Sequence, residues 1–146
     1  MENISFKNVK FNEGFWLNRY NLNKYSSIQS VYKRFEETGR IDTLRFNYTE
    51  GKIKPGVAQD SDVAKWTEAV SYLITSDPDC CADEVAIIEE LIDSMEKHQM
   101  DDGYLNPYFM QLFPDAIFCR RPAHELYSAG HLIEAAIAYH KATGKD

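Results

Sequence analysis

The stretch His124–Lys145, HELYSAGHLIEAAIAYHKATGK, decides the fold class of this chain. It predicts a helix from about His124 to Ala142, and Gly144 follows where a helix is expected to end. Its middle, Ala129–Ala138, is apolar on nearly every side and rich in small residues. A helix of this kind needs neighbours around most of its circumference. The stretch therefore indicates a helix packed inside an assembly of other helices.

Working outward from this helix, we expect three more. Apolar residues at three- and four-residue steps indicate a helix over about residues 20–38. A second helix follows the capping candidates Asp60-Ser61-Asp62 and stops near Ser76. Asp77-Pro78 then opens a third, with Asp as the N-cap and Pro in the first turn, where its missing N–H costs nothing.

Long irregular segments separate these helices. Residues 1–18 mix aromatic and polar side chains without a helical period, which predicts an extended N-terminal arm. Segments 40–59 and 99–123 contain Gly and Pro and read as loops. Helical bundles usually have short connections, so loops of about twenty residues favour a larger helical assembly seen in part. We predict an all-α fold of about four helices, with residues 1–146 as a single incomplete domain.

Composition narrows the class of protein. The formal net charge of −7 argues against a nucleic-acid surface, which needs clustered Lys and Arg. The first residues contain neither a targeting signal nor an apolar run long enough to span a membrane, so we expect no membrane partner and a cytoplasmic location. Three Cys, two of them adjacent at Cys80-Cys81, match neither a disulfide framework nor the spacing of a structural zinc site.

Two histidines invite a metal interpretation that their spacing does not support. The zinc motif H-E-x-x-H places its second His four residues after the first, whereas His131 follows His124 by seven. We therefore disfavour a metalloprotease and predict no metal ligand in this chain. His124 lies in the first helical turn beside a loop, where it can donate to a sugar hydroxyl or serve only as a capping residue. His131, within an apolar segment, is expected to be a core residue.

Acidic and loop residues supply weaker candidates. Glycoside hydrolysis requires two carboxyl groups that face the scissile bond. An acidic cluster of Asp60, Asp62 and Glu68 could supply them. Helix capping and an ion pair to Lys65 explain the same charges. The segment Asp101-Asp102-Gly103 is expected to be a turn rather than a calcium loop, because it lacks alternating ligands and a closing Glu.

Five stretches of the chain resemble one enzyme family, the β-L-arabinofuranosidases of glycoside hydrolase family 127. They agree with its N-terminal region in order and spacing over essentially the whole chain, and the last of them is the most specific. The stretches are Gly14-Phe15-Trp16, Thr38–Asp42, Asp60–Ala69, Asp102–Phe109 and His124–Lys145.

This resemblance implies an (α/α)6 barrel of twelve helices in two rings, with the sugar bound at the mouth of the inner ring. It implies retaining hydrolysis by a cysteine nucleophile that also ligates zinc, with glutamate as acid/base. Those residues lie downstream of the region matched here, so no catalytic or metal-binding residue is assigned to this chain. The resemblance places a sugar-contacting histidine at His124, and Asp62, Tyr104 and Asn106 are weaker candidates for substrate binding.

Two other interpretations stay open at this point. The chain could be a free-standing helical module that binds carbohydrate or dimerises, or part of an epimerase or lyase on the same scaffold, because one fold hosts many chemistries. In each case the apolar helix faces need a cover, supplied by the remainder of the barrel or by a homo-oligomer.

Overall fold

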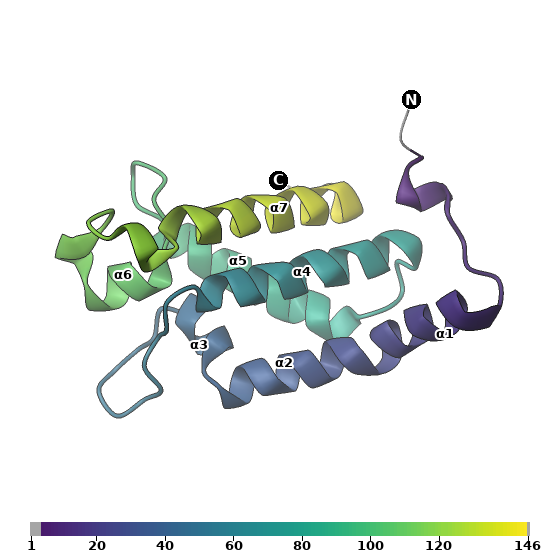
Figure 1. Cartoon of the computed structure of the whole chain (residues 1–146), viewed down its shortest axis with the longest axis horizontal. Helices are drawn as coiled ribbons and strands as arrows, with labels where there is room; N and C mark the ends of the chain where they lie inside the picture. Colours follow the sequence, from purple (N-terminus) through teal and green to yellow (C-terminus); the bar gives the residue numbers. More distant parts are fainter. Residues whose placement is uncertain (1–3, 146) are drawn as a thin grey trace.

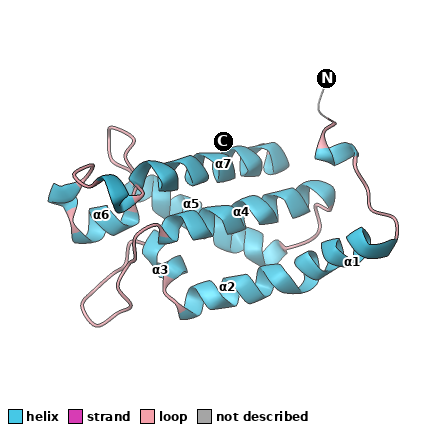
Figure 2. Cartoon of the chain, in the orientation of Figure 1, coloured by secondary structure: helices cyan, strands magenta, loops and turns pink. Residues whose placement is uncertain are grey.

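The computed structural model describes residues 4–145, and its regular structure there is entirely helical (Figure 2). Seven α-helices within these residues are connected by loops and short helical turns. The α-helices are α1 (Gly14–Leu22), α2 (Ile28–Glu37), α3 (Arg40–Leu44), α4 (Gln59–Ser76), α5 (Ala82–His98), α6 (Pro107–Leu112) and α7 (Glu125–Thr143).

The first long helix begins earlier than the sequence predicted. A π-helical turn at Asn23–Ser27 joins α1 to α2, so the chain is helical from Gly14 to Glu37. The prediction of an extended arm over residues 1–18 is therefore wrong from Gly14 onward, and a 3-10 turn at Phe6–Asn8 interrupts it as well; residues 1–3 lie outside the described residues. Nothing in α1 is buried, so its sequence has no buried stripe from which a helical period could be recognised.

The start of α5 also differs from the prediction. The helix begins at Ala82 rather than at Asp77-Pro78, after Cys81 in a left-handed backbone conformation. Asp77 does not cap it, because its carboxylate pairs with the ammonium group of Lys24 on the π-helical turn. The Asp77 side chain, which the local sequence predicted to cap a helix, instead forms a long-range ion pair with Lys24.

Helices α4 and α7 run side by side in the same direction, while α2 and α5 run the opposite way (Figure 1). This is an arrangement of two helical hairpins, each pairing one helix of the α4/α7 layer with one antiparallel helix. Two clusters of buried side chains hold it together. Burial of each large aliphatic side chain in them stabilises the fold by roughly 1.5–3 kcal/mol. The clusters comprise Ile28, Trp66, Val70, Leu73, Ile74, Ile88 and Tyr139, and Ile41, Leu44, Val63 and Leu91.

Small side chains allow α4 and α7 to pack closely. Ser71 and Ser128 are completely buried, and Ala135 and Ala138 are nearly so. The opposite face of α7 is uncovered: Leu126, Ile133 and Ile137 are 76%, 59% and 49% exposed. The sequence required neighbours around α7, and the described residues supply them on one side only.

No described helix is both long enough and apolar enough to cross a bilayer. The cytoplasmic location stays a prediction.

Candidate functional site

The first turns of α4 and α7 lie at the same end of the molecule, where the loops 45–58 and 99–124 also gather (Figure 1). Parallel helices place their N-terminal ends, with unpaired backbone N–H groups, on one surface. Three of the four predicted substrate-binding residues, Tyr104, Asn106 and His124, come from the segment before α7, and Asp62 comes from the first turn of α4. The structure therefore brings all four to one end.

His124 is exposed and occupies the position immediately before α7. Its backbone has φ of 60°, a left-handed conformation that is uncommon for a residue with a side chain. The imidazole lies edge-on to the ring of Tyr127, with ring centroids 5.8 Å apart, and Tyr127 contacts the ring of His131 at 4.6 Å. His131, which was expected in the core, is only half-buried, and its Nδ1 lies 3.2 Å from the Glu134 carboxylate.

Asp62 lies close to this aromatic row but is already paired. Its carboxylate accepts a hydrogen bond from Arg40 Nε at 2.9 Å and lies 3.6 Å from Lys65 Nζ, which confirms the expected ion pair with Lys65. Lys65 in turn lies over the ring of Tyr127, 5.2 Å from its centroid. A continuous set of contacts therefore joins Asp62 on α4 to His124 on α7.

The three carboxylates considered as an acid/base cluster are not brought together. Asp60 is 2% exposed and accepts a hydrogen bond from the Ser128 hydroxyl at 2.8 Å, so it ties α4 to α7. Burial raises the pKa of Asp60, while hydrogen bonds from Ser128 and from the Ser61 N–H act in the opposite direction. Glu68 instead accepts a hydrogen bond from Tyr72 within the same helix.

Asn106 is interior rather than exposed. It is 2% exposed, its Oδ1 accepts a hydrogen bond from the Phe109 N–H at the start of α6, and its Nδ2 donates to Asp60 at 3.4 Å. These bonds occupy its side-chain amide. Asn106 therefore caps the N-terminus of α6 and joins the loop to α4. The structure thus gives Asn106 a place behind the surface on which His124 lies.

Tyr104 is joined to the first residue of α7. Its hydroxyl donates to Glu125 Oε2 at 2.5 Å, and the Phe118 N–H donates to both oxygens of the same carboxylate at 3.0 and 3.1 Å. Burial and the Glu125 carboxylate both raise the pKa of Tyr104, so the phenol keeps its proton. Glu125, itself 7% exposed, therefore fixes two points of the 99–123 loop beside His124.

The adjacent pair Cys80-Cys81 lies away from this site, whereas Cys119 lies in the segment before α7. Cys80 and Cys81 lie between the last turn of α4 and the first turn of α5, at the other end of the helices. Among residues 4–145 no three His, Cys, Asp or Glu side chains are grouped closely enough to hold a metal ion. The described residues therefore do not fit a zinc site.

Comparison with known proteins decides the family. The model for the catalytic domain of the GH127 β-L-arabinofuranosidases matches residues 8–146. The chain belongs to glycoside hydrolase family 127. It is 38% identical over 98 residues to a non-reducing end β-L-arabinofuranosidase of Bifidobacterium longum subsp. longum, an alignment that covers 62% of this chain and 14% of that enzyme.

A solved family 127 structure has the same arrangement of helices. A GH127 β-arabinofuranosidase superposes with a TM-score of 0.79 at 29% identity, covering 96% of this chain and 24% of that one. The prediction of an all-α fold that forms part of an (α/α)6 barrel is confirmed. The chain spans less than a quarter of the length of either relative.

Sequence reasoning missed several residues of the site. Glu125 looked like an ordinary acidic residue in a first helical turn, and Asp60 like a cap, because their partners are 7 to 68 residues away. Tyr127 and Lys65 carried a usable signal, since Tyr127 lies three residues after His124 on the same helical face.

Proposed function

We propose that the protein to which this chain belongs is a glycosidase that releases L-arabinofuranose from β-L-arabinofuranosides by retaining hydrolysis. The support is family membership together with 38% identity to an enzyme of that activity. In this proposal the nucleophile and the acid/base come from residues outside the chain, and this chain supplies one wall of the sugar site. By itself it is inactive.

His124 is the residue of this chain that contacts the sugar. One observation carries this assignment: an exposed imidazole is held at the mouth of the α4/α7 pair, next to an aromatic ring and beside a loop fixed by Glu125. A ring nitrogen of His can donate to or accept from a sugar hydroxyl, according to its tautomer. Among residues 4–145 the imidazole of His124 has no hydrogen-bond partner, so it is available to substrate.

The other three candidates divide into two roles. Asp62, whose side chain is 38% exposed, faces the same surface and contacts substrate through a carboxylate oriented by Arg40 and Lys65. Tyr104 and Asn106 act behind the surface by fixing the loop through Glu125 and Asp60.

Zinc is proposed for the whole enzyme and not for this chain. It would supply charge stabilisation to a thiolate ligand, because a metal ion favours the deprotonated thiol. The residues described here take no part in holding it, and their contribution is to bind and orient the sugar.

The remainder of the barrel is proposed to cover the exposed face of α7. Leu126, Ile133 and Ile137 form an apolar stripe at helical spacing, as expected of a helix with a further neighbour. A second copy of the chain would cover the same stripe if the chain were a free-standing module.

Activity of the intact protein tests the proposal. It is expected to release 4-nitrophenol from 4-nitrophenyl β-L-arabinofuranoside, and His124→Gly is expected to lower kcat/KM roughly two- to tenfold, the usual scale for one lost hydrogen bond to substrate. Glycine accepts the left-handed backbone of this position, so lost activity cannot be assigned to strain.

The matched control is His140→Gly, which changes a histidine near the other end of α7. Equal kinetics for His124→Gly and the wild type would remove His124 from the site. If the intact wild-type protein bound L-arabinose but had no arabinofuranosidase activity, the binding module would be favoured instead.

A further inference from the structure

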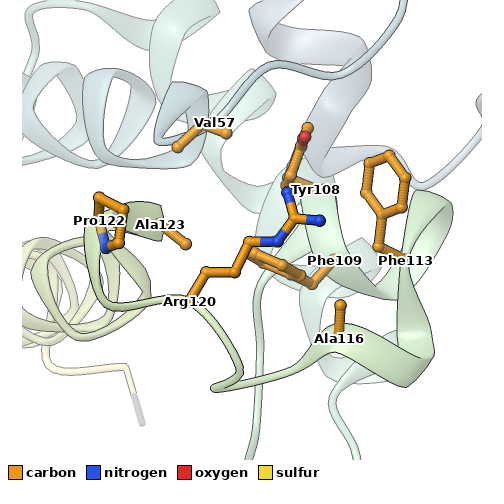
Figure 3. Close-up of a pocket in the computed structure, with 8 residues that line it drawn as sticks. All are labelled: Val57, Tyr108, Phe109, Phe113, Ala116, Arg120, Pro122 and Ala123. Carbon is orange, nitrogen blue, oxygen red and sulfur yellow. The ribbon is translucent and has the colours of Figure 1, made fainter.

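A cavity lies beside the candidate sugar site. Its volume is about 180 Å3, and it opens between the loop before α4 and the segment from α6 to His124. Figure 3 shows Arg120 extended across it, with the guanidinium group directed toward Tyr108. The lining residues are Val57, Tyr108, Phe109, Phe113, Ala116, Arg120, Pro122 and Ala123.

The charge in this cavity is uncompensated. Arg120 is its only charged lining residue, and no ion pair or hydrogen bond of its guanidinium is found within residues 4–145. Arg40 and Arg45, by contrast, each pair with a carboxylate. A second cation, Lys54, lies 5.4 Å from the ring centroid of Phe113. In a chain of net charge −7, an unpaired guanidinium in an aromatic cavity, with a second cation near the ring of one lining residue, indicates an anionic occupant.

Arginine suits an oxyanion that accepts two hydrogen bonds, such as a carboxylate or a phosphate. Its guanidinium presents N–H donors as a rigid fork that matches the two oxygens of a carboxylate. The rest of the lining is aromatic, with Tyr108 5.1 Å from Phe109 and 5.4 Å from Phe113 between ring centroids. Apolar and aromatic walls with one oriented polar group are typical of small-molecule pockets.

The cavity is small and adjoins His124. Its volume is below the roughly 300–1,000 Å3 of pockets for drug-sized ligands, so it suits a single ring. Pro122 and Ala123 form one wall, and the Ala123 N–H donates to the Arg120 carbonyl at 3.1 Å. This short turn joins Arg120 directly to His124, so a ring in the cavity lies next to a sugar held by His124.

We propose that this cavity binds a uronic acid residue that adjoins the arabinofuranosyl unit. Arg120 donates hydrogen bonds to the carboxylate of this uronic acid. The position of the uronic acid next to the arabinofuranosyl unit rests on the proposed function, which assigns that unit to His124. The carboxylate site itself depends only on the cavity.

Direct binding to the intact protein tests the proposal. Methyl β-D-glucuronide and methyl β-D-glucoside, which differ in the carboxylate, are titrated against the wild type and two variants by isothermal titration calorimetry. We expect the glucuronide to bind more tightly than the glucoside, and Arg120→Ala to weaken glucuronide binding roughly ten- to hundredfold, as for a lost hydrogen bond to a charged group. Arg121→Ala, the adjacent exposed arginine outside the cavity, is the matched control and is expected to change it less than twofold.

Three results would overturn the proposal: equal affinity for glucuronide and glucoside, equal effects of Arg120→Ala and Arg121→Ala, or inorganic phosphate binding as tightly as the glucuronide, which would make this a site for any anion. The titration requires no turnover, so it separates the two proposals. An intact protein that binds glucuronide through Arg120 but hydrolyses no arabinofuranoside would leave the cavity site standing and remove the proposed function.

Discussion

Replacing Glu125 tests whether this carboxylate fixes the loop beside His124. In Glu125→Ala, the Tyr104 hydroxyl and the Phe118 N–H both lose their acceptor. A hydrogen bond to a charged group contributes roughly 1.5–3 kcal/mol, so the free energy of opening the 104–123 loop is expected to fall by about 3 kcal/mol. At about 1.4 kcal/mol per factor of ten, the loop would open more than a hundredfold more often.

Hydrogen–deuterium exchange of peptides covering residues 104–123 measures this effect in the intact protein. Glu125→Gln keeps one acceptor oxygen and is expected to give an intermediate rate. Glu134→Ala is the control, because the Glu134 side chain is 62% exposed and a surface ion pair contributes only about 0–1 kcal/mol. Equal exchange of the loop in Glu125→Ala and Glu134→Ala would refute the role assigned to Glu125.

Three further predictions follow from other parts of the fold. Gly39→Ala is expected to lower the free energy of unfolding in urea by at least about 1 kcal/mol, because φ is 74° and an added Cβ would lie 2.8 Å from an isoleucine side chain. Burial raises the pKa of Cys81 to about 12, so iodoacetamide at pH 8 should alkylate Cys81 far more slowly than exposed Cys119. The hydrogen bond from Lys24 lowers the pKa of Asp77, so this pair stabilises the fold above the usual Asp pKa and is lost as pH falls below it; Lys24→Met should weaken the acid dependence of stability.

Each of these has an outcome that contradicts it. Gly51→Ala is the control for Gly39, because Gly51 also has a positive φ but open space around it, and equal losses would exclude the predicted clash. Equal alkylation of the two cysteines would contradict burial of Cys81. An identical urea midpoint from pH 5 to pH 2 in the wild type and Lys24→Met would show that the ion pair adds nothing.

The sequence was sufficient for the elements that bury a periodic face. α4 and α7 follow the predicted ranges because Val63, Trp66 and Val70 recur at helical steps and a glycine ends α7. α1 was predicted as extended because its aromatic side chains are exposed and leave no period to read. Helices α3 and α6, of five and six residues, are too short for a period and depend on tertiary packing, α3 against α4 and α6 against α3.

The candidate site was predicted in outline and not in its contacts. His124 could be placed from its motif, because the first position of a predicted helix beside a loop is a local property. Asn106 and Tyr104 were weaker candidates for substrate binding, and the structure places them at the same end of the molecule as His124. Their burial could not be foreseen, since it depends on Asp60 and Glu125 at distant positions in the chain. Long-range hydrogen bonds leave no periodic trace in the sequence.

A crystal structure of the intact protein with L-arabinose tests the central claim most directly, that the mouth of the α4/α7 pair forms one wall of the sugar site. The account predicts the sugar at the first turns of these helices, with a hydroxyl oxygen about 2.6–3.2 Å from a ring nitrogen of His124. L-arabinose bound at the opposite ends of α4 and α7, near Cys80 and Cys81, or bound with no contact to this chain, would contradict it.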